Sequence, residues 1–535
     1  MQLRLNRKTA GRYTKKLLPH RRSSDTMRGP LNLLDQSAGE SHVMLSILGH
    51  AKKLCNGVTR RDWIRVGSLG LAGLTLPQLT ELQAASTGEG TSFGKAKGVI
   101  LIHLYGSPSQ LEWADPKPDA PVEIRGELKS IKSSLPGCDV CELMPNFAKV
   151  VDRCTVLRSL THPYPIHGVA YALTGVPAID VAMELSPRDS RHWPFFGSVV
   201  EHVERQRPRE IPANLVLPWR FSSKRKGEVS RAGPYAAFLG PQYDPLFLEY
   251  SGEANKGYIK TLNGQKYEDH DPYVGLKDGS YFVTPGVAAL TADVTLDRLH
   301  SRKSLLEQLN VVQQQLGASQ VGREMNKHQA AAWNLIESSK LTESLDLRRE
   351  VPKSRELYGS SLFGQSLLAA RRLIEAGGRV VTVFWDEFGL AGSGWDTHWD
   401  HYGRMKNELC PGFDTGFYGL VTDLDQRGLL DDILVVCTSE HGRTPKIQPV
   451  NGTAGRDHWS RAYTSIIAGA GVKRGCVVGQ TDRTGGDVAD RPISPKDLLA
   501  TMYHLLGVDV RQTIPDRAGR PMPLTDGDVI HEALS

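Results

Sequence analysis

The chain has 535 residues, of which 40% are hydrophobic and 23% charged, a composition that suits a large globular α/β core. Its net charge of +6 is unevenly distributed. Residues 1–65 carry fourteen Lys and Arg against four Asp and Glu, whereas residues 66–535 carry 51 basic and 55 acidic residues. The body of the protein is therefore mildly acidic, which excludes a nucleic-acid-binding function inferred from the high pI.

The basic N-terminal region has the pattern of a targeting signal. Arg60 and Arg61 precede bulky apolar residues, and an uncharged stretch rich in Gly, Leu and Ala follows over residues 66–79. The small residues Ala84 and Ala85 offer a cleavage site. We interpret residues 1–85 as an N-terminal extension with a twin-arginine signal peptide, and expect export to the periplasm or the extracellular space.

The alternative to a signal peptide is a cytosolic amphipathic helix, which the four residues Gly67, Gly70, Gly73 and Pro77 disfavour. No other segment has the length and apolar character of a membrane span. Six cysteines lie beyond the signal. An oxidising compartment would allow one disulfide among Cys138, Cys141 and Cys154.

A polar linker over residues 86–97 is followed by alternating strand and helix patterns. Continuous apolar runs predict five buried strands, over Gly98–Leu104, Thr155–Leu160, Arg379–Trp385, Ile433–Thr438 and Tyr463–Ala468. Helical patterns cover Ser366–Ala376, Phe413–Arg427 and Asp497–Leu506. The alternation predicts an α/β fold in which helices sandwich a largely parallel sheet.

Residues 178–300 interrupt this alternation. They are rich in Pro, Gly, Tyr and charged residues, and we interpret them as an insertion that forms a cap over one end of the sheet. A long charged helix is expected over residues 299–338. The α/β domain is therefore predicted to span residues 98–520, with residues 521–535 as a C-terminal tail.

Acidic and histidine side chains follow the predicted strands, at the edge where open parallel sheets bind ligands. They are Glu112, Asp115, His162, His167, Asp396, His398, His401, Glu440, His441, Asp457 and His458. A single histidine in a loop is more often a hydrogen-bonded structural residue than a ligand, but clusters after several strands favour a metal site. Carboxylates mixed with imidazole suit divalent ions such as zinc, manganese or magnesium, and such ions bind phosphoryl and sulfuryl esters.

Several motifs resemble an exported bacterial family known as domain of unknown function 1501. They are Ser107-Pro108-Ser109 with Asp115-Pro116-Lys117-Pro118, Leu173-Thr174-Gly175, Trp395-Asp396-Thr397-His398, Glu440 with Gly442-Arg443-Thr444-Pro445, and Gly455-Arg456-Asp457-His458-Trp459. That family is similar to the sulfatase and alkaline phosphatase superfamily. The resemblance implies an alkaline-phosphatase-like fold and a metal-dependent hydrolase of sulfate or phosphate esters, with a small-molecule or polysaccharide-derived substrate.

The resemblance also implies roles for particular residues. The first-strand acidic ligand would be Glu112 or Asp115, and an acid–histidine pair would be Asp396 with His398 or His401. Further ligands would be Glu440, His441, Asp457 and His458, although the family more commonly has Phe at the position of His441. The metal would be zinc, manganese, magnesium or calcium.

The sulfatase nucleophile position falls on Pro165, which has no nucleophilic group. Thr161 carries the nearest Ser or Thr hydroxyl, His167 is polar enough to bind an anion, and Arg443 completes the predicted catalytic group. Three alternatives follow. A metal activates water directly, Thr161 moves into position, or the protein is a non-catalytic binding or assembly protein on a hydrolase scaffold.

The sharpest prediction concerns convergence at the metal site. Asp396, His398, Glu440, Asp457 and His458 are expected within ligand distance of one another, with Glu112 or Asp115 approaching from the first strand. The alternative is a structural ion pair between Asp457 and Arg443, with His458 capping a turn.

Overall fold

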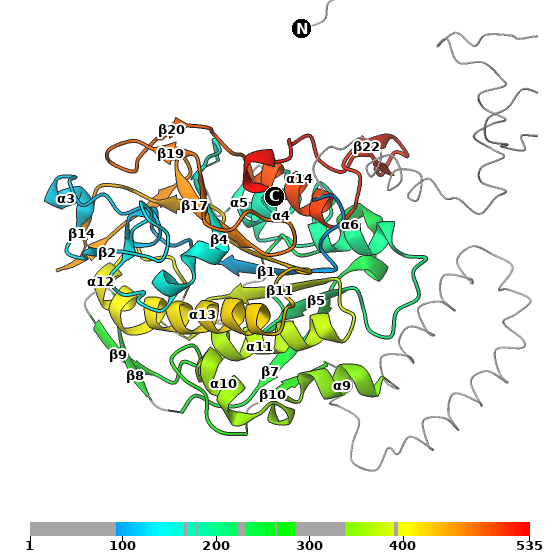
Figure 1. Cartoon of the computed structure of the whole chain (residues 1–535), viewed down its shortest axis with the longest axis horizontal. Coiled ribbons are helices and arrows are strands. Elements are labelled where there is room, and N and C mark those ends of the chain that lie inside the picture. Colours follow the sequence, from blue (N-terminus) through cyan, green and yellow to red (C-terminus); the bar gives the residue numbers. More distant parts are fainter. Residues whose placement is uncertain are drawn as a thin grey trace, which may run out of the picture. The chain divides into compact units, whose positions relative to one another are not determined.

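A computed structural model describes residues 92–535, apart from 165–167, 178–179, 223–230, 256, 263–264, 280, 285–337, 390–393 and 451. Its centre is an eight-stranded sheet (Figure 1). In spatial order the strands are β18 (Cys476–Val478), β4 (Cys154–Leu160), β17 (Tyr463–Ala468), β12 (Ile433–Thr438), β1 (Gly98–Leu104), β11 (Val380–Trp385), β5 (Asn214–Leu217) and β6 (Leu246–Phe247).

Strand β1 is the middle of the sheet and pairs in parallel with both β11 and β12. All seven of its residues are buried, because helices cover both faces of the sheet. Strand β17 is the exception to the parallel arrangement, since it runs antiparallel to β12 and β4. The predicted fold class, a largely parallel sheet sandwiched by helices, is confirmed.

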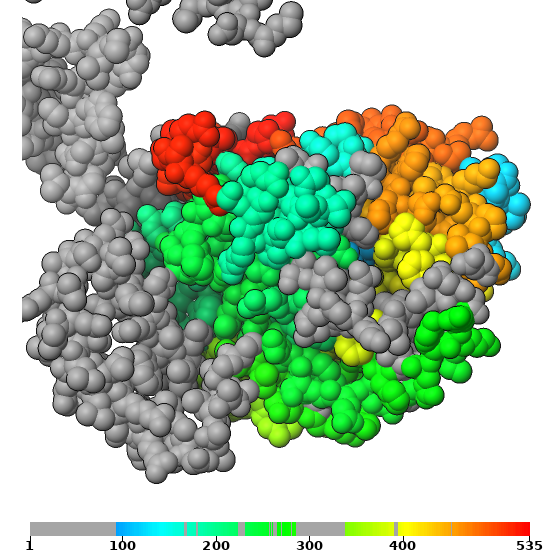
Figure 2. All heavy atoms as spheres, turned by 180° about the vertical axis from the view of Figure 1, so that it is seen from behind, coloured from blue at the N-terminus to red at the C-terminus, as the bar shows by residue number. Residues whose placement is uncertain are grey.

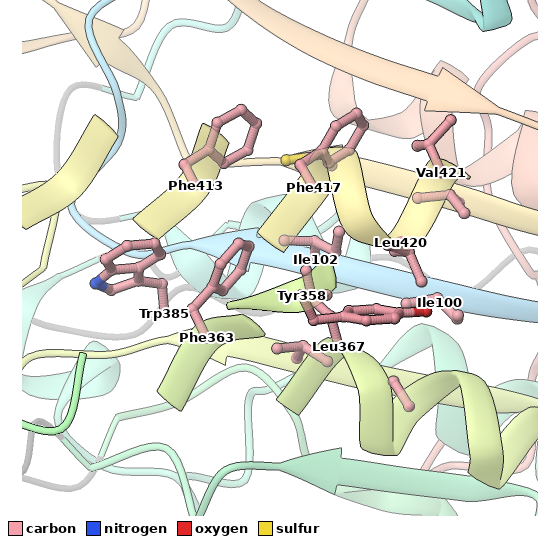
Figure 3. Packing of buried hydrophobic residues seen from close by; sticks show 14 of the residues in the cluster. Ile100, Ile102, Tyr358, Phe363, Leu367, Trp385, Phe413, Phe417, Leu420 and Val421 are labelled. Carbon is pink, nitrogen blue, oxygen red and sulfur yellow. The ribbon is translucent and has the colours of Figure 1, made fainter. Parts of the chain in front are cut away.

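One face of the sheet is covered by α11 (Leu362–Glu375) and α13 (Cys410–Gln426). Figure 3 shows Ile100 and Ile102 of β1 packed among the side chains of these two helices. Phe363 of α11 lies against Trp385, with ring centroids 4.7 Å apart. Burying aromatic side chains of this size contributes several kcal/mol, so this face anchors the strands whose ends carry the site.

The opposite face carries α4 (Val169–Thr174), α6 (Phe196–Val203) and α14 (Pro495–Leu505) (Figure 1). Phe196 of α6 and Tyr503 of α14 are in contact, with ring centroids 4.8 Å apart. From behind, Figure 2 shows the red C-terminal residues beside the blue-green residues near position 200. Residues far apart in the sequence therefore close this second half of the core.

The segment 178–300 differs from the prediction of a cap. It contributes α6 to one face and strands β5 and β6 to an edge of the sheet. Both strands are short, four and two residues, so no period-2 or continuous apolar pattern revealed them. The predicted signal peptide and nearly all of the predicted helix at 299–338 lie outside the described residues.

The six cysteines beyond the signal are all free, so the disulfide considered among Cys138, Cys141 and Cys154 is absent from the structure. Cys138 instead accepts a hydrogen bond from the Arg158 guanidinium at 3.3 Å. Across the part of the chain that the structure describes, no helix is long and apolar enough to cross a membrane.

Candidate metal centre

The candidate site lies at the carboxyl ends of the parallel strands. β1 is followed by Gly106 and Ser107, and the parallel strand β12 is followed by Glu440 and His441. Strand β17 runs the other way, so the segment before it reaches the same edge. That segment includes β16 (His458–Trp459), which pairs with β13 (Gly442–Arg443). Three separate segments therefore meet where the sequence predicts a ligand site.

Asp396, His398 and His458 form a cluster whose side-chain ligand atoms all lie within 4.8 Å of one another. The Nε2 atoms of His398 and His458 are 3.0 and 3.1 Å from Oδ1 of Asp396. These two imidazole nitrogens are only 3.0 Å apart. One carboxylate oxygen and two imidazole nitrogens converging in this way suit a divalent ion, because a cation relieves the repulsion between facing lone pairs.

A neighbouring carboxylate holds His398 in the orientation that a metal requires. Oδ1 of Asp457 lies 2.6 Å from Nδ1 of His398, so a proton on Nδ1 leaves the lone pair of Nε2 directed at the cluster. Burial opposes protonation of His398, but Asp396 and Asp457 outweigh it and raise its pKa. Metal and protons would therefore compete for this imidazole. Asp457 contacts the cluster through His398 and is not part of it.

Arg443 is completely buried and bonds the same oxygen of Asp396 that the two histidines face. Its Nη2 donates to Asp396 Oδ1 at 2.5 Å, and its Nε donates to the carbonyl of Ser107 at 3.2 Å. The alternative ion pair between Asp457 and Arg443 is therefore wrong, since Arg443 pairs with Asp396. This ion pair makes Arg443 a residue that orients Asp396.

Glu440 is placed next to this cluster but joined to other partners. Its Oε1 accepts a hydrogen bond from the backbone N–H of Gly106 at 2.7 Å, and its Oε2 lies 3.2 Å from Nε2 of His103. Both side chains are fully buried. Glu440 thus ties the end of β12 to the end of β1, and the predicted five-residue convergence is reduced to three residues. His103 was not among the predicted site residues, although it is the one ionisable residue within the apolar run of β1.

His441 packs against the cluster. Its ring centroid is 4.4 Å from that of His458, and its Nδ1 lies 2.9 Å from the carbonyl of Gly442. The backbone N–H of His441 donates to the hydroxyl of Ser107, a residue held at the left-handed φ of 70°. A strained backbone of this kind persists only where surrounding contacts impose it. Here these contacts come from both His441 and Arg443.

The two first-strand acids are engaged in structural ion pairs, so the predicted approach of Glu112 or Asp115 to the metal site is wrong. Glu112 pairs with the buried Arg456, whose Nε is 3.1 Å from Oε1, and its Oε2 lies 3.6 Å from Nε2 of His401. Burial would raise the pKa of Glu112, but Arg456 and His401 lower it to about 2. Asp115 binds Lys117 at 3.0 Å and also the hydroxyl of Thr481.

Of the predicted catalytic residues near β4, the structure describes Thr161 but not His167. Thr161 is half-buried, and its backbone N–H donates to the carbonyl of Ile493 at 2.9 Å. His167 lies outside the described residues, as does Pro165. Among the described residues of this loop, His162 contacts the segment that carries Glu440. Its Nδ1 accepts from the backbone N–H of Tyr164 at 3.2 Å, and its Nε2 donates to the carbonyl of Glu440 at 2.6 Å.

The fold and the cluster together define an α/β protein with a candidate metal centre at the carboxyl edge of its sheet. The model of a family described as "Protein of unknown function (DUF1501)" matches residues 96–534, and the chain belongs to this family. Among curated proteins, none matches the chain.

Three of the solved structures to which the chain is similar at a distance are the following. The phosphonate monoester hydrolase SpPMH from Silicibacter pomeroyi is 11% identical, with 82% of this chain and 76% of that chain covered and a TM-score of 0.34. The PsFucS1 sulfatase from Pseudoalteromonas sp. is 10% identical, with coverages of 80% and 70% and a TM-score of 0.30. A structure concerning glycosaminoglycan metabolism by Bacteroides thetaiotaomicron is 10% identical, with coverages of 77% and 72% and a TM-score of 0.33. Similarity at this level does not identify a reaction.

Proposed function

We propose that the protein is an exported, metal-dependent hydrolase of sulfate or phosphate esters. The observation that carries this proposal is the Asp396, His398 and His458 cluster, whose donor atoms converge at the carboxyl edge of the sheet. The side chains of Asp396, His398 and His458 are 15%, 29% and 18% exposed, so the cluster is accessible from solvent. Accessible imidazole and carboxylate ligands are the arrangement of a catalytic metal site, which keeps a position for substrate or water.

Each residue has a defined task in this proposal. Asp396, His398 and His458 hold the ion, Asp457 keeps His398 in the metal-binding tautomer, and Arg443 fixes the carboxylate of Asp396. When bound, a divalent metal polarises an ester oxygen and makes a coordinated water more acidic. Two imidazoles in the set favour zinc or manganese over magnesium or calcium, which prefer oxygen ligands alone.

The absence of a hydroxyl at position 165 favours a second candidate, a non-catalytic metal-binding or assembly protein on the same scaffold. In the catalytic case either water attacks the ester directly or the Thr161 hydroxyl is the nucleophile, since Pro165 cannot form a covalent intermediate. Turnover decides between the two. Stoichiometric metal without hydrolysis of aryl sulfates or aryl phosphates supports the non-catalytic protein.

The metal assignment is tested by metal analysis of the purified protein and its His458→Ala and His398→Ala variants. We expect bound zinc or manganese in the wild type and little in either variant, while exposed His270→Ala retains it. Equal metal content in all four proteins would show that the cluster is scaffold and would remove the basis of the hydrolase proposal.

Export is a separate part of the proposal and rests on the Arg60–Arg61 pair followed by the apolar stretch at 66–79. Replacing both arginines with lysine should leave the precursor in the cytoplasm, whereas the wild type is recovered from the periplasm or the medium. Cell fractionation and immunoblotting measure this. Equal distribution of the two proteins would contradict the twin-arginine route.

A further inference from the structure

Arg404, the last residue of α12 (His401–Arg404), is a buried arginine that forms no ion pair with any described residue (Figure 1). Its residue is only 6% exposed. The other buried arginines in the described part of the chain are each paired with a carboxylate; they are Arg231, Arg371, Arg379, Arg443 and Arg456. Burying a guanidinium without a carboxylate is destabilising by itself. The reason for its position therefore lies in the other contacts that Arg404 makes.

The guanidinium of Arg404 bonds the loop that carries two of the candidate metal ligands. Its Nη1 donates to the backbone carbonyl of Asp396 at 2.8 Å, and its Nη2 donates to the backbone carbonyl of Gly394. Hydrogen bonds from a charged donor are roughly twice as strong as neutral ones. The planar guanidinium thus bridges two carbonyls of one loop and fixes the backbone at Asp396.

Arg404 also acts on the second ligand of this loop, through Trp399. The guanidinium carbon lies 5.9 Å from the ring centre of Trp399, within the range of cation–π contacts. Trp399 in turn stacks on His398 at an interplanar angle of 20° and a centroid distance of 6.3 Å. Asp400, four residues before Arg404, interacts with it electrostatically but forms no ion pair with it. One side chain therefore contacts the backbone of Asp396 and the ring that packs on His398.

We propose that Arg404 is a positioning residue of the candidate metal centre, which holds Asp396 and His398 in the arrangement that binds the ion. The inference rests on the proposed function for the metal, whereas the ordering of the loop is measurable without metal. Arg443 bonds the carboxylate of Asp396, and Arg404 bonds its backbone. Lysine cannot replace Arg404, because a single ammonium group does not bridge two carbonyls and also stack on an indole.

Arg379 is a matched control at the opposite edge of the sheet. It is 7% exposed and, like Arg404, donates to two backbone carbonyls, those of Ala96 at 2.8 Å and Leu506 at 2.7 Å. It directly precedes β11, at the amino end of this parallel strand, and is paired with Glu204. Arg379→Lys therefore removes a comparable set of bonds at the edge that does not carry the metal centre.

The test compares metal binding by the wild type, Arg404→Lys and Arg379→Lys. Competition with a chromogenic chelator measures the Kd for zinc, and the visible absorption of bound Co²⁺ reports the geometry of its ligands. We expect Arg404→Lys to raise the Kd for zinc about tenfold or more and to change the Co²⁺ spectrum. Arg379→Lys should lower the Tm and leave both metal measurements unchanged. The same Kd in all three proteins, or an equal rise in both variants, overturns the positioning role.

Trp399→Leu tests the second contact at a half-buried position, where a substitution disturbs folding less. It removes the ring between Arg404 and His398 but leaves both carbonyl bonds, so the Kd for zinc should rise by less than in Arg404→Lys. In the double variant the two rises should combine to less than their product, because both substitutions act on His398. An unchanged Kd in Trp399→Leu, or full multiplication of the two effects, overturns the route through Trp399.

Hydrogen exchange of the metal-free protein separates this inference from the proposed function. The backbone N–H groups of Trp395 and Thr397 donate to the carbonyls of Tyr105 and Trp395, at 2.7 and 2.9 Å. These amides should exchange about tenfold faster in Arg404→Lys than in the wild type or Arg379→Lys. Unchanged exchange overturns the inference even if metal binds. A wild type that binds neither zinc nor Co²⁺ overturns the proposed function, and exchange then decides whether Arg404 orders the loop.

Discussion

Glu112 shows how a predicted ligand serves instead as a counter-charge. Its carboxylate is the ionic partner of the fully buried Arg456. Glu112→Gln would leave that guanidinium buried without a carboxylate, so we expect a loss of about 3–5 kcal/mol in the free energy of unfolding. Urea denaturation measures this, with the exposed pair variant Glu253→Gln expected to change stability by less than about 1 kcal/mol.

The stabilisation that the Glu112 carboxylate provides depends on pH. Its pKa is about 2 in the folded protein and 4.5 as the unperturbed value. Because the folded pKa is the lower one, the stabilisation is fully present above pH 4.5 and is lost as the pH falls toward 2. Between pH 2 and pH 4.5, the free energy of unfolding should therefore depend less steeply on pH in Glu112→Gln than in the wild type. An unchanged pH slope would contradict the ion pair.

Asp457 is expected to act on metal affinity through His398. In Asp457→Asn the amide replaces the charged partner of Nδ1, which weakens the basicity and orientation of the ligand. We expect the Kd for zinc to rise 10- to 100-fold, measured by competition with a chromogenic chelator. Full occupancy at saturating zinc should persist, which distinguishes an orienting residue from a ligand. An unchanged Kd would place Asp457 outside the metal centre.

At the level of elements, the turn after β1 is the part of the fold that connects the strand to the site. Gly106 has φ 86°, and a Cβ there would overlap the backbone of Asp396. Gly106→Ala should therefore reduce both stability and metal affinity. Gly428, after α13, has φ 68° and open space around it, so Gly428→Ala should cost only the strain of about 1–2 kcal/mol and leave metal affinity unchanged. Equal metal binding by the two variants would refute the coupling of the turn to the site.

Elements of the sheet were predictable where burial is complete over six or seven residues. β1, β11 and β12 are continuous apolar runs and were predicted within one residue. β5 and β6 were not predicted, because four and two residues give no periodic signal. Within the site, the spacing of acids and histidines indicated the sheet edge, but a carboxylate's partner is decided by tertiary contacts. Glu440 and Glu112 therefore could not be assigned to His103 and Arg456 from sequence.

At the scale of the whole molecule, a metal that binds only the folded protein adds to its stability. The gain is RT ln(1 + [M]/Kd), about 2.7 kcal/mol when the free metal is at one hundred times Kd. We expect a chelator to lower the Tm of the wild type by several degrees and to leave the Tm of His458→Ala unchanged. Differential scanning calorimetry with and without EDTA measures both. An equal response of the two proteins would show that the stabilising metal binds elsewhere.

The central position of β1 also has a consequence for the order of events on the ribosome. Its two neighbours in the sheet, β11 and β12, are synthesised about 280 and 335 residues later. At a synthesis rate of about 5–20 residues per second, β1 remains without a pairing partner for roughly 15 to 60 s. During that time its apolar residues depend on chaperones or transient contacts for protection. A chain whose synthesis stops before residue 380 would therefore contain an unpaired, aggregation-prone strand. Quality control has to act on such a polypeptide before the sheet can form.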